Sequence, residues 1–209
     1  MNYFQNVEYI VCNQQHQYLL IHKSGCTYIR SVLSEICSCL DYNFEKDRSL
    51  PSWTVIRDPY ERLISGITYD LKMFDHNIFN KKRVAKEILL DKNFIKSIFS
   101  RSGPFRTLGK TVHYIPQFFY FLPENVDFFV MLEDVDRFFE SNMDVDLKKV
   151  KNKQKNSSNE KYKKIVESII KDHDELNRSI QDHLSFEYYA IDMLYMNDRV
   201  WRWNYGKVL

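Results

Sequence analysis

The sequence predicts an α/β fold, a single domain over residues 1–209 in which a mainly parallel central sheet is flanked by helices. Short β-rich runs alternate along the chain with longer segments whose apolar residues recur at three- and four-residue spacing, as strands alternating with amphipathic helices do. With 209 residues, 44% of them hydrophobic, the chain can bury one substantial core and is short for two. In such folds, ligands bind beyond the carboxyl ends of the strands.

The amino-terminal region predicts two strands followed by a helix. The runs VEYIVC (7–12) and YLLIHK (18–23) are β-rich, and the polar turn NQQHQ between them suits a hairpin or two neighbouring strands. A helix over 27–40 is indicated because apolar side chains line one of its faces. These side chains are Ile29, Val32, Leu33, Ile36, Cys37 and Leu40.

A second strand is predicted over Trp53–Ile56, with a helix immediately after it. Asp58 suits the N-cap of this helix and Pro59 its first turn. Its buried stripe is expected to comprise Tyr60, Leu63, Ile64, Ile67, Leu71 and Phe74. The segment 84–99 repeats the helical period, whereas 100–111 mixes glycine, proline, basic and hydroxyl residues and indicates a loop near a substrate.

The carboxyl-terminal half predicts one more strand-to-helix step and a long helix. The apolar run Phe128–Leu132 suits a strand buried on both faces, and Glu133-Asp134 leads from it into a helix. The polar stretch 148–161 separates that helix from a long one bearing Ile165, Val166, Ile169, Ile170, Leu176 and Ile180. The aromatic tail from Phe186 to Trp203 is expected to pack back onto the body.

Charge and composition exclude several classes of partner. The 30 basic and 28 acidic residues give a formal charge of +2, which is too even to indicate binding to nucleic acid or an anionic membrane. No stretch approaches the roughly 20 apolar residues of a membrane span, and a cytoplasmic location is expected. The cysteines, Cys12, Cys26, Cys37 and Cys39, are not at metal spacing, and a bond between Cys37 and Cys39 is not expected within a helix, so reduced thiols are predicted.

The segment Lys23-Ser24-Gly25-Cys26-Thr27 has the features of a phosphate-binding loop. It follows a strand and opens a helix, so its backbone N–H groups converge where the helix dipole also favours an anion. Gly25 lets the backbone approach a ligand, Thr27 can donate its hydroxyl, and Lys23 supplies a positive charge. The loop differs from a Walker A loop because its lysine precedes its glycine. The alternative interpretation is an ordinary strand-to-helix turn with an exposed lysine.

A second motif favours the phosphate interpretation. Arg57 lies at the end of another predicted strand, and Ser65 follows about two helical turns later. A guanidinium group and a hydroxyl on one groove suit a terminal phosphate. Both could therefore line a site beside the first loop.

These motifs resemble those of the sulfotransferases that use 3′-phosphoadenosine-5′-phosphosulfate (PAPS), and in particular the carbohydrate-modifying branch. IHKSGCTYIRSVL is similar to the family's 5′-phosphosulfate loop, although His22 stands where proline is usual and Tyr28 where serine is usual. VIRDPYERLISGI is similar to the 3′-phosphate motif, with Arg57, Asp58, Pro59, Arg62 and Ser65 in step. VHYIPQ (112–117) more loosely resembles a His-x-x-Pro-Gln element of the family.

The resemblance implies a P-loop-like sulfotransferase fold and a set of roles. Lys23 and the amides of Gly25, Cys26 and Thr27, with Ser24 beside them, would bind the 5′-phosphosulfate. Arg57 and Ser65 would hold the 3′-phosphate, and Ser158, in the basic loop, would lie near the nucleotide. Transfer would be in line, with PAPS as co-substrate and no metal.

The acceptor hydroxyl needs a base, for which there are two candidates. His113 lies in a loop beside Gly109 and Pro116, and histidine is the side chain most often used as a base near neutral pH. Glu133, at a strand end, is the second candidate. Each has a structural alternative, His113 as a residue that hydrogen-bonds loop backbone and Glu133 as an exposed acid at a helix start.

Two other functions remain open at this stage. A nucleotide-dependent kinase would share the loop and fold, and Glu133-Asp134 could hold its Mg²⁺, but no Walker-type lysine is present. A non-catalytic module could bind a phosphorylated ligand through the same residues. A carbohydrate acceptor rests on the family likeness alone, and the sequence does not reveal the acceptor's identity or the oligomeric state.

Overall fold

The computed structural model describes residues 8–38, 40–43, 45–74, 81–90, 116–119, 125–150 and 160–202. The chain divides into two compact units. The first comprises Met1–Asp58, Gln117–Asn156 and Tyr189–Leu209, and the second comprises Pro59–Pro116 and Ser157–Tyr188. Whether the chain behaves as the predicted single domain is not tested by this division and stays a prediction.

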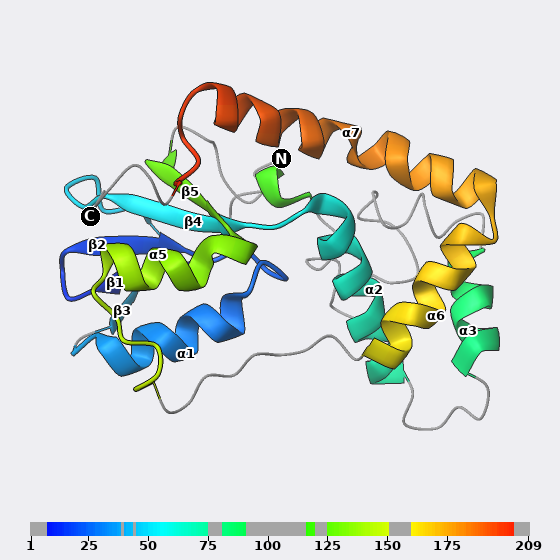
Figure 1. The fold of residues 1–209 in the computed structure, drawn as a ribbon, viewed down its shortest axis with the longest axis horizontal. Helices are drawn as coiled ribbons and strands as arrows, with labels where there is room; N and C mark the ends of the chain where they lie inside the picture. Colours follow the sequence, from blue (N-terminus) through cyan, green and yellow to red (C-terminus); the bar gives the residue numbers. More distant parts are fainter. Residues whose placement is uncertain are drawn as a thin grey trace. The chain divides into compact units, whose positions relative to one another are not determined.

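A five-stranded sheet lies in the first unit (Figure 1). Its strands are β1 (Tyr9–Cys12), β2 (His16–Leu19), β3 (Leu40–Asn43), β4 (Ser52–Ile56) and β5 (Phe128–Met131), in the order β3-β1-β2-β4-β5. β1 pairs antiparallel with both β2 and β3, whereas β4 pairs parallel with β2 and β5. The α/β class is confirmed, but the sheet is mixed because the hairpin and the unpredicted β3 add antiparallel pairings to the parallel half.

The β1–β2 hairpin closes through a turn shorter than the predicted NQQHQ. Asn13 and Gln14 both have positive φ, 51° and 57°, and the N–H of Gln15 donates to the Cys12 carbonyl at 3.0 Å. This is the geometry of a type I′ turn, whose twist matches that of the strands. His16, which the predicted turn included, therefore belongs to β2 and is buried.

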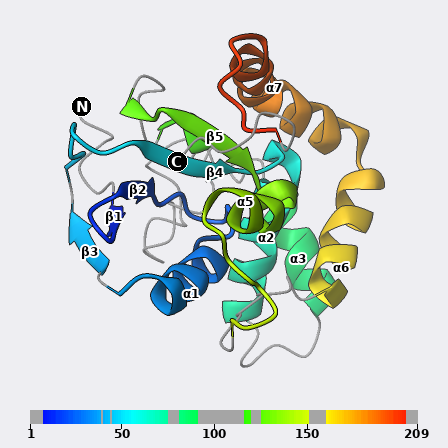
Figure 2. The ribbon, with the colours of Figure 1, turned by 60° about the vertical axis from the view of Figure 1, so that its left-hand side comes forward.

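Two helices, α1 (Cys26–Ile36) and α5 (Val135–Asn142), pack on one face of this sheet (Figure 2). A one-turn 3-10 helix, η6 (Leu132–Asp134), joins β5 to α5. The centre of the core is Trp53, whose ring centroid lies 4.7 Å from that of Tyr18 and 4.8 Å from that of Phe138. The helix residues buried around it include Ile29, Val32, Leu33, Val135, Phe138 and Phe139.

The end of α1 differs from the prediction. The helix stops at Ile36, and the chain turns to form β3, which pairs Leu40 with Cys12. This return brings Cys12 and Cys37 together in a disulfide with 5.8 Å between their Cα atoms. The prediction of reduced thiols is therefore wrong for this pair, because placing Cys37 within a helix concealed its proximity to β1. Cys26 is a free thiol.

The second unit contains α2 (Pro59–Phe74), α3 (Lys81–Leu89), α6 (Glu160–Lys171) and the first part of α7 (Asp174–Met196). Its core comprises Leu63, Ile64, Ile67, Ala85, Leu89, Tyr162, Val166, Ile169, Ile170, Leu176, Ile180 and Leu184. The predicted long helix is thus two helices, separated where the His173 N–H donates to the Ile170 carbonyl at 3.2 Å.

The end of the described chain returns to the sheet. Val200 forms a parallel bridge with Phe129, and Trp201 is buried with its ring 5.5 Å from that of Phe138. The expected packing of the aromatic tail is confirmed for Trp201, but Phe186 lies in α7 and is exposed. None of the helices in the described part of the chain has the length and apolarity needed to cross a membrane.

Candidate functional site

The carboxyl ends of three strands carry the residues that the sequence singled out. Within the first unit, β2, β4 and β5 are parallel neighbours, so their carboxyl ends lie at one edge of the sheet. The predicted phosphate loop follows β2, Arg57 follows β4, and Leu132 begins the turn after β5. We call this the carboxyl edge.

The loop between β2 and α1 has an unusual backbone. Lys23 has a φ of 65° and Gly25 a φ of 79°, and the Gly25 carbonyl accepts the first helical hydrogen bond, from Ile29 N–H at 3.0 Å. A left-handed φ is uncommon for a lysine and costs free energy that surrounding contacts must offset. Such conformations cluster at ligand-binding sites, which makes Lys23 noteworthy beyond its charge.

A side chain at position 25 would meet a neighbour as well as an unfavourable backbone. A Cβ at this position would lie 2.5 Å from Leu132 Cδ1, which is far inside van der Waals contact. The missing side chain thus lets the loop pack directly against the end of β5. Sequence reasoning assigned Gly25 to close approach of a ligand, whereas the direction in which its side chain would project is occupied by the protein itself.

The remaining loop residues differ in burial. Ser24 has no exposed surface, and its hydroxyl has no hydrogen-bond partner in the part of the chain that the structure describes. Cys26 and Thr27 open α1 and are half-buried. The first N–H groups of a helix lack intrahelical acceptors, so this end of α1 presents donors to an anion.

Arg57 is adjacent to this loop. Its Nη1 donates to the Lys23 carbonyl at 3.4 Å, so Arg57 and the predicted phosphate loop lie side by side at the carboxyl edge. The Arg57 main chain is held by Gln117, whose Oε1 accepts from Arg57 N–H at 3.0 Å and whose Nε2 donates to the Arg57 carbonyl at 2.8 Å. Gln117 begins a short 3-10 helix, η4 (Gln117–Phe119), and is fully buried.

Sequence reasoning did not include Gln117 among the site residues. The available signal was VHYIPQ, which ends in this glutamine and was connected with the family only as a loose likeness. A glutamine that bonds to backbone groups leaves no periodic pattern in the sequence. Its role becomes visible only when Arg57 and Gln117, 60 positions apart in the chain, are seen in contact.

The turn after β5 carries Glu133 and leads into a brace between helices. Glu133 is exposed, as expected for either a base or an acid at a helix start. The Tyr28 hydroxyl donates to Asp136 Oδ1 at 2.6 Å, and burial together with the Asp136 carboxylate raises the pKa of Tyr28. Tyr28 therefore ties the start of α1 to the start of α5.

The other predicted site residues fall elsewhere. Ser65 is half-buried on α2 in the second unit, so its pairing with Arg57 on one groove stays a prediction. Arg62 of the same helix is buried. His113 and Ser158 lie outside the described residues, and their assigned roles remain predictions.

The residues at the carboxyl edge are of types that favour anions. The start of α1, Lys23 and Arg57 are close neighbours in the fold there, and helix N–H groups, lysine and arginine each favour negative charge. Among the described residues, no three His, Cys, Asp or Glu side chains gather as ligands of a metal ion. Comparison of the chain with models of protein families, with curated proteins and with solved structures finds no match.

Proposed function

We propose that this protein is a sulfotransferase that moves a sulfonyl group from PAPS to an acceptor hydroxyl. The support comes from the two motifs named above, which resemble the 5′-phosphosulfate loop and the 3′-phosphate motif of that family. PAPS carries anionic groups at both positions, so its recognition requires two neighbouring anion sites. No metal takes part in the proposed reaction.

The contact between Arg57 Nη1 and the Lys23 carbonyl, at 3.4 Å, is the single observation that carries the proposal. The two motifs are distant in sequence, and a single nucleotide can bridge them only if their strand ends are adjacent. Parallel pairing of β2 with β4 provides that adjacency.

In the proposed reaction the acceptor oxygen attacks sulfur in line with the leaving phosphate oxygen. A bond forms between the acceptor oxygen and sulfur, and the bond between sulfur and the 5′-phosphate oxygen breaks. Lys23 neutralises the charge that develops on the leaving oxygen, and the α1 N–H groups bind the phosphate. The products are a sulfate ester and adenosine 3′,5′-bisphosphate.

The acceptor loses its proton to a base as the new bond forms. His113 and Glu133 are the two candidates, and the exposure of Glu133 at the carboxyl edge makes it accessible to an acceptor. We keep carbohydrate as the proposed acceptor class because of the likeness to that branch of the family. Ser65 and Ser158 belong to the proposal as further contacts of the nucleotide.

A cytoplasmic location was predicted in part from reduced thiols. The Cys12–Cys37 disulfide argues instead for an oxidising compartment, because disulfides persist where thiols are not kept reduced. Alkylation of the protein in intact cells, followed by mass measurement of the Cys12 and Cys37 peptides, distinguishes the two locations.

Nucleotide binding tests the proposed donor. By calorimetry we expect adenosine 3′,5′-bisphosphate to bind more tightly than ATP, and Arg57→Ala to weaken bisphosphate binding by at least about tenfold, as loss of a charge-assisted hydrogen bond does. Arg178→Ala, which removes an exposed arginine of α7, is the matched control and should leave binding unchanged. Equal or tighter binding of ATP would contradict the proposal and favour a kinase.

Transfer of radiolabelled sulfonyl groups tests catalysis. A panel of hydroxyl acceptors, with carbohydrates foremost, is incubated with labelled PAPS. Lys23→Ala should lower the rate by about a hundredfold or more, as loss of a charge-stabilising group does. Lys171→Ala, which removes an exposed lysine at the end of α6, should not. Label transfer that survives Lys23→Ala would overturn the mechanism, and bisphosphate binding without transfer to any acceptor would favour a binding module.

A further inference from the structure

Arg57 lies one residue beyond the last rung of its strand. The parallel pairing of β4 with β5 ends at Ile56 and Met131. Arg57 follows that rung, where its N–H and carbonyl still need hydrogen-bond partners, as buried backbone groups do. The Gln117 side chain supplies both, at 3.0 and 2.8 Å, in the manner of one further rung of the sheet.

The contact with Gln117 restricts the backbone of Arg57. Two hydrogen bonds to one residue's backbone hold its N–H and carbonyl in fixed directions, and those directions determine where the side chain leaves the chain. Gln117 has no exposed surface, so water does not compete for its amide. The guanidinium of Arg57 then reaches the Lys23 carbonyl, the position from which it would meet a phosphate bound beside the loop.

We propose that Gln117 is a positioning residue for Arg57 and thereby determines the preference of the site for a nucleotide with a 3′-phosphate. The inference rests on the proposed function, since it assumes that Arg57 binds the 3′-phosphate. Gln117 itself touches the arginine backbone and acts on the ligand only through it. Without this amide, Arg57 would have to be ordered each time a ligand bound, and the free-energy cost of that ordering would weaken its contact with the 3′-phosphate. Contacts at the 5′ side of the nucleotide would not change.

The same sheet offers a matched control. Gln17 of β2 is also fully buried, and its side chain also bonds to backbone groups. Its Oε1 accepts from Asp47 N–H at 3.0 Å and its Nε2 donates to the Leu50 carbonyl at 3.0 Å. Gln17 pairs with Ser52 at the amino end of the parallel strands, the edge opposite the loop. Replacing either glutamine by methionine removes comparable hydrogen bonds at similar volume, so both variants should lose stability.

The decisive measurement is a ratio of two dissociation constants, that of adenosine 5′-monophosphate over that of adenosine 3′,5′-bisphosphate. This ratio isolates the 3′-phosphate, and a general loosening of the fold does not change it. We expect a ratio of at least about ten for the native chain, and a fall of about fivefold in Gln117→Met, on the scale of a charge-assisted contact. Gln17→Met should keep the native ratio.

A double variant shows whether Gln117 acts through the arginine. Arg57→Ala should bring the ratio close to one, and adding Gln117→Met should lower it no further, since the side chain being positioned is gone. If Gln117→Met fails to fold by circular dichroism, Gln117→Glu takes its place, because it keeps the acceptor for Arg57 N–H while losing the donor. The expected fall in the ratio is then smaller but in the same direction.

Each outcome bears on one of the two claims. A native ratio near one would contradict the proposed function, whatever the variants do. A high native ratio that Gln117→Met and Gln117→Glu both preserve would overturn the positioning role and leave the function standing. A fall in the ratio of equal size in Gln117→Met and Gln17→Met would also overturn the positioning role, because the effect would then come from a general loss of order in the sheet.

Discussion

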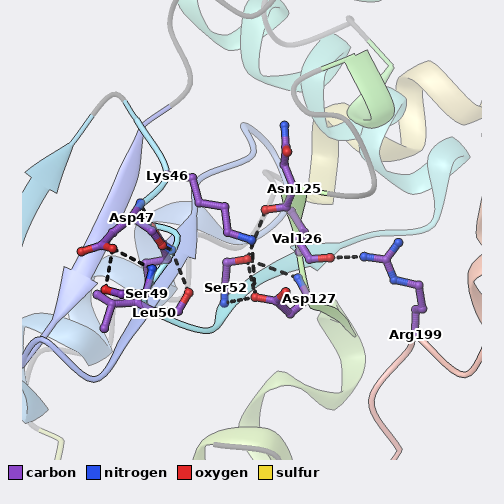
Figure 3. A network of polar contacts seen from close by, with 10 residues as sticks. Lys46, Asp47, Ser49, Leu50, Ser52, Asn125, Val126, Asp127 and Arg199 are labelled. Carbon is purple, nitrogen blue, oxygen red and sulfur yellow. Dashed lines mark hydrogen bonds and ion pairs between the residues drawn. The ribbon is translucent and has the colours of Figure 1, made fainter.

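The two edges of the sheet in the first unit are built differently. At the amino edge, where β4 and β5 begin, polar groups are paired with one another (Figure 3). Asp127 Oδ2 accepts from Ser52 N–H at 2.6 Å and from Ser52 Oγ at 2.8 Å, and Lys46 Nζ lies 3.5 Å from the same oxygen. Arg199 donates to the Val126 carbonyl. These contacts hold the first residues of β4 close to the start of β5, and they give the polar side chains at this edge hydrogen-bond or ion-pair partners.

The carboxyl edge differs in its backbone conformation and in how its polar groups are paired. Lys23 and Gly25 have left-handed backbones outside any hairpin, whereas at the amino edge Asn13 and Gln14 have them as part of the β1–β2 turn. The buried Ser24 hydroxyl has no hydrogen-bond partner among the described residues. Strain and unsatisfied polar groups lower stability, and natural proteins retain them mainly where a ligand or a reaction requires them. Under the proposed function, polar residues of one sheet would serve structure at one end and binding at the other.

The largest expected effect is at Gly25. Gly25→Ala should cost about 3 to 4 kcal/mol of unfolding free energy, because an L side chain is strained at this φ and its Cβ would overlap Leu132. Urea denaturation measures the loss. In a Leu132→Ala background the overlap is relieved, so Gly25→Ala should then cost only about 1 to 2 kcal/mol, the backbone part. An equal cost in both backgrounds would show that Leu132 is not the obstacle.

The second effect concerns the far end of α1, which the Cys12–Cys37 disulfide pins at the amino edge. Cys37→Ser should lower the unfolding free energy by about 3 kcal/mol, the value expected for releasing a loop of this length in the unfolded chain. Thermal melting with and without reductant measures it. Reductant should destabilise the native chain and leave Cys37→Ser unaffected, whereas Cys26→Ser, which removes the free thiol, should respond to reductant like the native chain.

Local patterns in the sequence predicted the elements that flank both motifs. The strand ending at Ile56, the helix from Pro59 and the strand from Phe128 are found as expected, because a run of buried apolar residues or a three-to-four periodicity marks each one. The Lys23 loop and Arg57 followed from such boundaries. Their adjacency depended on the parallel pairing of β2 with β4, which the alternation of strands and helices indicated.

What escaped prediction depends on contacts between distant residues. β3 is short and largely exposed, so no apolar run marked it, and the disulfide that it permits was missed with it. Gln117 bonds to the Arg57 backbone through its side-chain amide, and the sequence around a glutamine does not show which backbone groups it will meet. Leu132 was read only as the end of a strand, although it fills the space above Gly25. None of these contacts has a local signature.

A pH-dependent effect is expected at the amino edge. Trp53 Nε1 donates to His16 Nδ1 at 3.2 Å, which requires a neutral imidazole, and burial lowers the pKa of His16 to about 4. The unfolded chain therefore binds a proton that the folded chain rejects, so this stability is present above pH 6.5 and is lost as pH falls towards 4. The loss at pH 5 should be about 2 kcal/mol.

Comparison with a variant separates His16 from His183, whose pKa burial also lowers to about 4. In His16→Phe the decline in unfolding free energy between pH 7 and 5 should be smaller by about 2 kcal/mol, with the contribution of His183 remaining. Denaturation at both pH values measures this difference. A decline as steep as that of the native chain would mean that His16 titrates normally in the fold.

The smallest expected effect is also the most direct comparison of the two edges, since each has one fully buried serine. Ser52 Oγ bonds to Asp127 and to the Asn125 carbonyl at 3.1 Å, so Ser52→Ala should cost about 1 to 2 kcal/mol of stability and leave bisphosphate binding unchanged. Ser24→Ala removes a hydroxyl with no partner among the described residues, so it should be neutral or stabilise the fold by up to about 1 kcal/mol. If the Ser24 hydroxyl binds the ligand, Ser24→Ala should also weaken bisphosphate binding, by about threefold to tenfold. Loss of stability without loss of binding in Ser24→Ala would place this serine with Ser52, as a structural residue.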